Sequence, residues 1–154
     1  MANIVGEAAL SIDKPADVVW DWVVDPANMH LWVHDVDEPG SWVDDGSAAS
    51  GSKYRIDYKY GRKTNEIIFE VMAAERGKSF VVDTVAGPYP ILVRYGFAST
   101  RGGAKTELTI NMNARSDSWF TAVLFVLTGW FAKWFMKRRL RSELEDVKRE
   151  IEKL

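Results

Sequence analysis

Polar side chains that could act as acids or bases are spread along the β-rich middle of this chain. A carboxyl group held in an apolar cavity favours its neutral form, so it can serve as a general acid or base. The candidates are Asp57, Glu66, Glu70, Asp83, Arg94, Asn111 and Asn113. Because successive residues of a strand point to opposite faces, about half of such a set faces solvent. The pattern therefore defines no acid/base pair by itself.

Two histidines have a spacing that can bind metal. His30 and His34 are four residues apart, which places two ligands on one face of a helix, and Asp35 and Asp37 follow closely. No third ligand is determined by the spacing, and no glutamate of the zinc-protease type lies between the histidines. We therefore expect both histidines on an exposed turn and predict no metal site.

Other catalytic motifs are missing from the sequence. The chain has no cysteine, which excludes disulfides and thiolate chemistry, and it has no Gly-x-Ser-x-Gly motif. The glycines at 61, 77 and 102–103 are explained by hairpin turns rather than by a phosphate-binding loop. We predict no catalytic residue and no cofactor.

The composition is that of one domain covering residues 1–154. The chain has 154 residues, 47% of them hydrophobic, and a formal net charge of -2, so it shows no basic excess for nucleic acid. Residues 1–50 carry ten acids and one base, and residues 51–154 carry twelve acids and nineteen bases. The first residues lack a basic, apolar leader pattern, so the expected location is the cytoplasm.

The order of elements is a strand, two short helices, a meander of strands and a long helix. The first strand is expected over 3–12, followed by helices over 15–24 and 26–32, where Pro15 and Pro26 mark helix starts. Segments rich in Val, Ile, Tyr, Phe and Thr follow, separated by glycine turns. These segments predict strands at 41–45, 53–60, 62–75, 79–85, 90–100 and 104–115.

The last part of the chain, residues 117–154, predicts one long helix with two different halves. Its first half, 119–136, is apolar on nearly every side but is interrupted by Lys133. Its second half carries one apolar stripe at intervals of three and four: Met136, Leu140, Leu144, Val147, Ile151 and Leu154. Such a helix needs a cover, which is its own sheet, a ligand or a lipid surface.

The alternation of residues along the strands and the positions of the tryptophans indicate candidate binding residues. Tyr54 and Tyr58 share one face with Ile56, while Arg55 and Asp57 share the other, so the tyrosines are expected inside. By the same alternation Tyr95 and Phe97 face in and Arg94 faces out. Trp32 and Trp42 are expected at the rim of a cavity. The candidate ligand-binding residues are Trp32, Trp42, Tyr58, Phe69, Tyr95, Phe97, Trp119, Trp130 and Trp134.

Several segments resemble the START-like superfamily with the helix-grip fold. They are 12–20 (Ile-Asp-Lys-Pro-Ala-Asp-Val-Val-Trp), 25–28 with Trp32, 70–80, the glycine-led 102–108 and the closing stripe from Leu140 to Ile151. The sequence is most similar to the polyketide cyclase/dehydrase and lipid transport branch. The resemblance implies an α+β fold in which a curved antiparallel sheet of six or seven strands wraps around the C-terminal helix. It also implies a hydrophobic ligand: a lipid, quinone, polyketide or sterol-like molecule.

Three functions remain open on these grounds. The first is a non-catalytic binder or carrier of a hydrophobic small molecule held between sheet and helix. The second is a cyclase- or dehydratase-type enzyme that uses Asp57, Glu66, Asp83 or Arg94. The third is peripheral membrane contact through residues 119–141, with anionic lipid facing the bases Lys133, Lys137, Arg138, Arg139 and Arg141.

Overall fold

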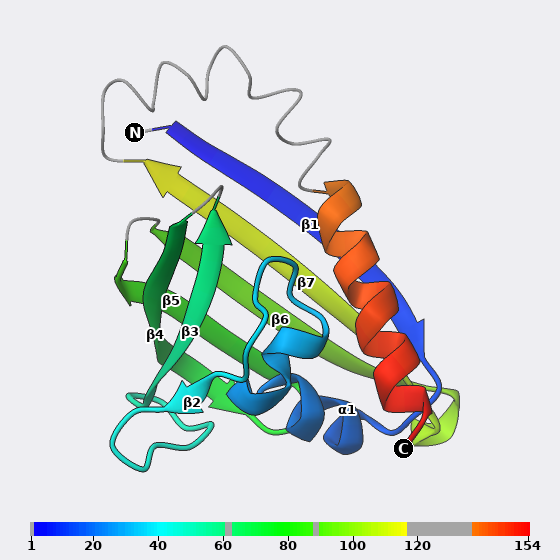
Figure 1. Cartoon of the computed structure of the whole chain (residues 1–154). Coiled ribbons are helices and arrows are strands. Elements are labelled where there is room, and N and C mark those ends of the chain that lie inside the picture. The colour runs from blue at the N-terminus through cyan, green and yellow to red at the C-terminus, as the bar shows by residue number, and fades with distance from the viewer. Residues whose placement is uncertain (1, 61–62, 88–89, 117–136) are drawn as a thin grey trace.

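The computed structural model describes residues 2–60, 63–87, 90–116 and 137–154. Their elements follow the expected order of strand, two short helices, strands and a final helix (Figure 1). The elements before the final helix are β1 (Ala2–Ile12), α1 (Ala16–Val23), the 3-10 helix η1 (Pro26–Leu31), β2 (Ser41–Trp42), β3 (Lys53–Tyr60), β4 (Lys63–Glu75), β5 (Ser79–Ala86), β6 (Ile91–Thr100), the 3-10 turn η2 (Arg101–Gly103) and β7 (Lys105–Ser116). The C-terminal helix comprises residues 137–152. The expected first half of that helix lies outside the described residues.

Seven strands of the described chain form one antiparallel sheet in the order β1-β7-β6-β5-β4-β3-β2. From β3 to β7 each strand pairs with the next one in sequence. The first strand forms the other edge of the sheet, where β1 pairs with β7 from Ala2 opposite Ser116 to Ile12 opposite Thr106. The sheet is strongly curved, and its concave face looks toward the helices (Figure 1).

The strand β2 is shorter than the sequence predicted. The expected strand at 41–45 ends at Trp42. Asp44 and Asp45 have φ angles of 52° and 55°, which belong to the left-handed region and are incompatible with an extended strand. The chain therefore leaves the sheet after Trp42 and returns only at Lys53, where β3 begins.

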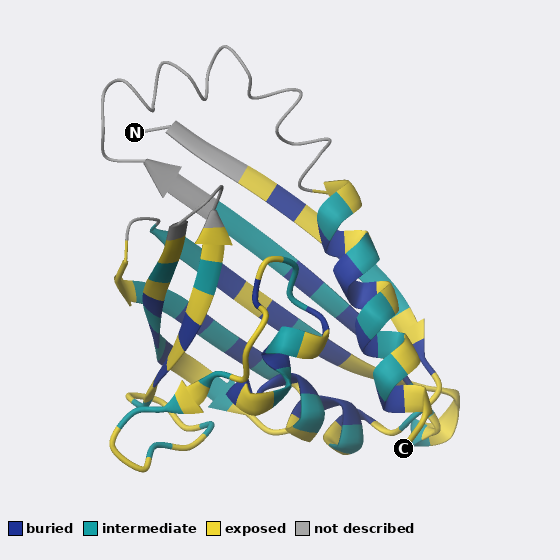
Figure 2. Cartoon of the chain, viewed as in Figure 1, coloured by how far each residue is buried: buried dark blue, intermediate teal, exposed yellow. Residues whose placement is uncertain are grey.

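Alternation along the strands builds the apolar side of the sheet. In β3, Tyr54 and Ile56 are buried while Arg55 and Asp57 are exposed, as the sequence predicted. Figure 2 shows the same alternation of buried and exposed positions along the other strands. A strand with one apolar face can be buried on one side only, so the concave face needs a cover.

The C-terminal helix supplies part of that cover. Leu140, Leu144, Val147 and Ile151 are each at most 2% exposed, and they lie on one side of the helix. Leu154, which the sequence placed in the same stripe, is 64% exposed, because the helix ends at residue 152. The described apolar stripe therefore runs from Leu140 to Ile151.

Polar contacts hold the helices at the ends of the sheet. The Lys148 ammonium donates a hydrogen bond to the Ser11 carbonyl at 2.9 Å, and the Asp13 amide donates to a Glu152 carboxylate oxygen at 2.9 Å. These two bonds tie the end of the helix to the end of β1. On the other side of the core, the Trp20 indole of α1 donates to the Ser79 carbonyl of β5 at 3.1 Å.

We expect Leu144→Ala to lower the free energy of unfolding by about 2–5 kcal/mol, because the fully buried side chain leaves a cavity that the sheet and helix cannot close. Urea denaturation followed by circular dichroism measures the loss. Leu154→Ala is the matched control at the end of the same segment, and its exposed side chain should change the value by no more than about 0.5 kcal/mol. Equal losses in the two variants would contradict the assigned helix face.

Candidate functional site

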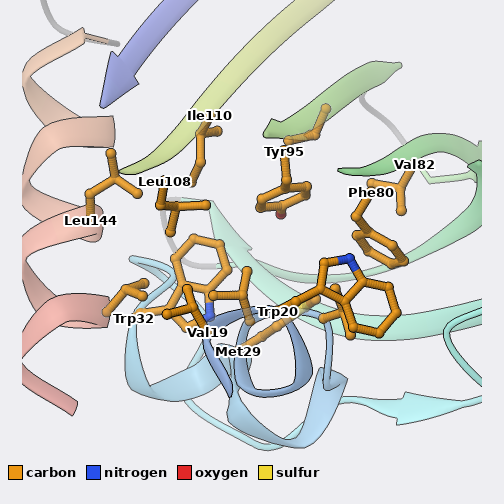
Figure 3. Packing of buried hydrophobic residues seen from close by; sticks show 14 of the residues in the cluster. Val19, Trp20, Met29, Trp32, Phe80, Val82, Tyr95, Leu108, Ile110 and Leu144 are labelled. Carbon is orange, nitrogen blue, oxygen red and sulfur yellow. The ribbon is translucent and has the colours of Figure 1, made fainter. Parts of the chain in front are cut away.

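Aromatic rings cross the concave face of the sheet and form what we call the aromatic belt. The rings come from α1, from the segment after η1 and from β2 to β6. The belt comprises Trp20, Trp32, Trp42, Tyr54, Phe69, Phe80 and Tyr95. Figure 3 shows part of it, with the Tyr95 and Phe80 rings extending from the sheet toward Trp32 and Trp20.

The belt consists of two series of touching rings. In the first, Trp42 meets the Tyr54 ring edge-on at 5.7 Å between centroids, and Tyr54 stacks on Phe69 at 5.2 Å. In the second, Phe80 contacts Trp20 at 6.1 Å and Tyr95 at 5.8 Å, and Tyr95 contacts Trp32 at 6.3 Å. Offset and edge-to-face pairs are favourable arrangements of aromatic rings.

The two tyrosines of the belt are neutral hydrogen-bonding groups. Burial raises the pKa of Tyr54 well above its usual value, and the neighbouring Tyr95 raises it further. Burial also raises the pKa of Tyr95, with a further contribution from the negative charge of Glu143. Both hydroxyls therefore remain protonated at every physiological pH, and each brings one polar atom into an apolar surface.

The Trp32 indole has a hydrogen-bond donor without an acceptor in the described part of the chain. Trp32 is only 3% exposed, and its Nε1 atom is buried without a partner there. The Trp20 indole, by contrast, donates to the Ser79 carbonyl. A buried donor that makes no hydrogen bond costs about 1–3 kcal/mol, so the position of the Trp32 N–H is energetically unfavourable in the protein alone.

A cluster of charged groups joins the C-terminal helix to the segment after η1, and we call it the helix–loop ion cluster. Its centre is Arg139, whose Nε lies 3.1 Å from a Glu143 carboxylate oxygen. The Nη2 atom of Arg139 donates to the His34 carbonyl at 2.8 Å and lies 3.3 Å from the Asp35 carboxylate. The guanidinium also lies over the Tyr58 ring, 5.5 Å from its centroid.

Glu143 is the buried carboxylate of this cluster. It is 3% exposed, and burial raises its pKa even though the Arg139 guanidinium and the His34 segment lower it. On the same helix, Asp146 lies 3.5 Å from Nε2 of His34. The positive charge of Arg139 is therefore balanced within the protein, by Glu143 and Asp35 together.

The structure brings most of the expected ligand-binding residues to one side of the sheet. Phe69, Tyr95 and Phe97 are buried, and Tyr58 and Trp42 are half-buried against the core. Trp32 differs from its expected place at the rim, because it is fully buried within the belt. Three further candidates, Trp119, Trp130 and Trp134, lie outside the described residues.

The acid/base candidates of the strands do not meet on the concave face. Asp57, Glu66 and Arg94 are exposed, and Glu66 pairs with Arg55 at 3.6 Å on the outer side. Asp83 is half-buried and directly follows the buried Val82, so alternation turns it away from the concave face. These residues therefore form no acid/base pair next to the aromatic belt.

The sequence interpretation did not identify Glu143 as a site residue, and it did not identify the contacts of Arg139. The sequence interpretation named Arg139 only in the membrane-contact alternative, as one of the bases that would face anionic lipid. In the structure it contacts Glu143, the His34 carbonyl and Asp35. The sequence does hold one signal, since Arg139 and Glu143 are four apart and Glu143 directly precedes the buried Leu144. The loop partners could not be read from helical spacing.

Neither a metal cluster nor a membrane-spanning helix occurs in the described ranges. They contain no group of three or more His, Cys, Asp or Glu side chains placed to hold a metal ion. Across the same ranges, no helix combines the length and the apolar character that crossing a bilayer requires.

Sequence comparison identifies the family. Residues 4–152 match the family described as polyketide cyclase / dehydrase and lipid transport, and the chain belongs to that family. No curated protein matches the chain in sequence.

Solved structures share the helix-grip fold with this chain. The Zhui aromatase/cyclase of Streptomyces sp. R1128 aligns with a TM-score of 0.71 at 12% identity, over 97% of this chain and 94% of that one. A START superfamily protein of Mycobacterium smegmatis aligns with a TM-score of 0.67 at 12% identity, over 97% and 98%. A protein of Thermus thermophilus aligns with a TM-score of 0.74 at 13% identity, over 96% of both chains. These identities support the shared fold, and the expected fold class is confirmed.

The raised pKa of Glu143 predicts a specific pH dependence of stability. Because the folded state binds this proton more tightly than the unfolded state, the wild type loses stability as pH rises through the usual value of 4.5 and then the higher folded pKa. The Glu143→Gln variant has no carboxyl proton at this position, so it lacks this pH-dependent contribution to stability. The free energy of unfolding of the wild type minus that of Glu143→Gln should therefore fall as the pH rises above about 4.5.

Guanidinium denaturation at a series of pH values measures this difference. Glu145→Gln is the control, because it removes an exposed carboxyl from the same helix. Its free energy of unfolding should depend on pH in the same way as that of the wild type. A difference that rises with pH would mean that the Arg139 ion pair outweighs the burial of Glu143, contrary to the assigned direction.

Proposed function

We propose that this protein binds a hydrophobic small molecule between the concave face of the sheet and the C-terminal helix, as a binder or carrier rather than as an enzyme. The observation that carries the proposal is the aromatic belt, the series of rings on the concave side of the sheet. Family membership supports a hydrophobic ligand, and the proposed candidates are a lipid, a quinone, a polyketide or a sterol-like molecule. A cytoplasmic location fits such a carrier.

The belt suits a flat or ring-containing ligand. Burial of apolar area contributes about 25 cal/mol for each Å², and rings packed edge-on add directional contacts. The half-buried Trp42 and Tyr58 lie where the belt approaches the surface, and both pack against the buried core. A ligand that extends the ring series would therefore lose most of its water-exposed surface.

The enzyme alternative lacks its expected residues. A cyclase or dehydratase needs an acid or base within hydrogen-bond reach of its substrate. Asp57, Glu66 and Arg94 are exposed on the outer side of the sheet. Glu143 is the buried carboxylate beside the belt, and it is paired with Arg139. This arrangement favours binding over proton transfer.

A second candidate function is contact with an anionic membrane surface. Lys137, Arg138 and Arg141 lie at the start of the described helix, where Lys137 and Arg141 are exposed and Arg138 is at the surface. In the sequence they directly follow the apolar segment 119–136. Basic side chains beside apolar residues are typical of proteins that rest on anionic lipid. A carrier of hydrophobic molecules could load or unload at such a surface.

Mass spectrometry of an organic extract from the natively purified protein tests the binding proposal. We expect one lipophilic species at close to one molecule per protein. Trp42→Ala should reduce its occupancy about three- to tenfold, because one ring of the belt is removed. Trp22→Ala is the matched control, since Trp22 is also half-buried and packs on the core outside the belt.

Three results would count against binding at the belt. The first is an extract without any lipophilic species, together with no saturable uptake of Nile red by the purified protein. The second is equal loss of ligand in Trp42→Ala and Trp22→Ala, which would indicate a general loss of packing. The third is unchanged occupancy in Trp42→Ala, which would place the ligand elsewhere.

Flotation with lipid vesicles tests membrane contact. The triple variant K137Q/R138Q/R141Q should bind vesicles containing phosphatidylserine roughly 100-fold more weakly than the wild type, since each basic residue contributes about 1 kcal/mol. R149Q/K153Q removes bases from the far end of the chain and serves as the control. Failure of the wild type to float on anionic vesicles, or flotation that is unaffected by salt, would exclude this function.

A further inference from the structure

The strongest unexplained feature of the molecule is the buried donor of Trp32. Its Nε1 atom is buried and has no acceptor among the described residues, although its ring contacts the Tyr95 ring. We propose that the Trp32 N–H is the polar anchor of the ligand site, and that it donates a hydrogen bond to a neutral oxygen acceptor on an otherwise hydrophobic ligand. This inference rests on the proposed function and names the class of ligand that the same site takes.

The position of Trp32 agrees with this role. Its ring contacts Tyr95 edge-on at 6.3 Å, at an angle of 83°, and so ends the second ring series of the belt. In Figure 3 the Trp32 ring lies on the side of Tyr95 that is closer to the C-terminal helix. A ligand lying along the rings would bring one end to Trp32. A bound acceptor removes the cost of the unpaired donor, whereas a pure hydrocarbon leaves that cost in place.

The charges near Trp32 decide which acceptor fits. Arg139 donates a hydrogen bond to the carbonyl of His34, two residues after Trp32, and the buried Glu143 lies 3.1 Å from Arg139. The cation beside Glu143, Arg139, is already paired with Glu143 and Asp35. Arg139 carries one positive charge beside the two carboxyl groups of Glu143 and Asp35, so a ligand carboxylate or phosphate would find no uncompensated positive charge among these groups.

A neutral oxygen meets none of these penalties. The Trp32 indole N–H is an uncharged donor, and the Tyr95 hydroxyl stays protonated because burial raises the pKa of Tyr95. Ketones, quinones and esters carry acceptors of this kind on apolar skeletons. The site therefore selects carbonyl-bearing lipophiles over plain hydrocarbons and over lipophilic anions.

A matched pair of probes tests the anchor. 2-Acetylnaphthalene carries a ketone, and 2-ethylnaphthalene is a hydrocarbon of nearly the same shape. Their affinities are measured by titration calorimetry for the wild type, for Trp32→Phe and for Trp22→Phe. The quantity of interest is the ratio of the two dissociation constants, because comparing this ratio between variants cancels the different costs of removing each probe from water.

We expect Trp32→Phe to lower the preference for the ketone about tenfold relative to the wild type, while affinity for the hydrocarbon changes by less than about threefold. Trp22→Phe makes the same chemical change outside the belt and should leave the preference within about twofold of the wild-type value. 2-Naphthoate should bind the wild type more weakly than the ketone does.

The results distinguish the proposed hydrogen bond from Trp32 from the proposed binding of hydrophobic molecules. If both naphthalene probes bind the wild type and their ratio is unchanged in Trp32→Phe, the anchor is wrong and hydrophobic binding stands. If neither probe binds the wild type, the proposed function fails for this ligand class and the anchor fails with it. Tighter binding of 2-naphthoate than of the ketone would overturn the assignment of a neutral acceptor.

A second measurement does not depend on whether Trp32→Phe folds. In the wild type labelled with ¹⁵N-tryptophan, one indole N–H signal should lie further downfield with the ketone bound than with the hydrocarbon bound, because the two probes share the same ring current and only the ketone accepts a hydrogen bond. Where Trp32→Phe folds, its spectrum should lack that signal. No selective shift of any indole signal at saturating ketone would overturn the anchor.

Discussion

The structure depends on covering one apolar face of a curved antiparallel sheet. In the longer strands, buried side chains alternate with intermediate or exposed ones, so the sheet buries its concave face and leaves the other more exposed. Within the described ranges, the C-terminal helix covers the part of that face next to β1 and β7 and buries Leu140, Leu144, Val147 and Ile151 (Figure 1). The short elements α1 and η1 complete the cover at one end (Figure 1). Every described candidate binding residue is positioned by this arrangement.

The same cover brings charge close to the rings. The helix that carries Leu144 also carries Glu143, and the segment after η1 brings His34 and Asp35 against Arg139. A buried ion pair is weak evidence of stabilisation, because removing both charges from water offsets much of their attraction. Its clearer effect is electrostatic, because carboxylates compensate the positive charge of Arg139. The donors of the aromatic belt, such as Trp32 and Tyr95, are uncharged.

The periodic features of this fold could be predicted from the sequence. Period-two alternation placed Tyr54 inside and Asp57 outside, and the apolar stripe with its three- and four-residue intervals identified the buried helix face. Local backbone geometry could not be predicted, as the left-handed Asp44 and the shortened β2 show. Contacts between distant segments were also hidden, because no local pattern reveals that Arg139 reaches the His34 carbonyl. The aromatic belt was therefore more predictable than the helix–loop ion cluster.

The pairing of β1 with β7 has a consequence for how the chain is made. Ala2 lies opposite Ser116. The first strand to leave the ribosome therefore remains unpaired until its partner strand is synthesised about a hundred residues later. Pairings of such large sequence separation form slowly, because a long loop must close first. During translation β1 and the growing hairpins expose unpaired edges, which are prone to aggregate. Folding of this sheet is therefore completed after synthesis of β7, and the nascent chain is the state in which chaperones would matter most.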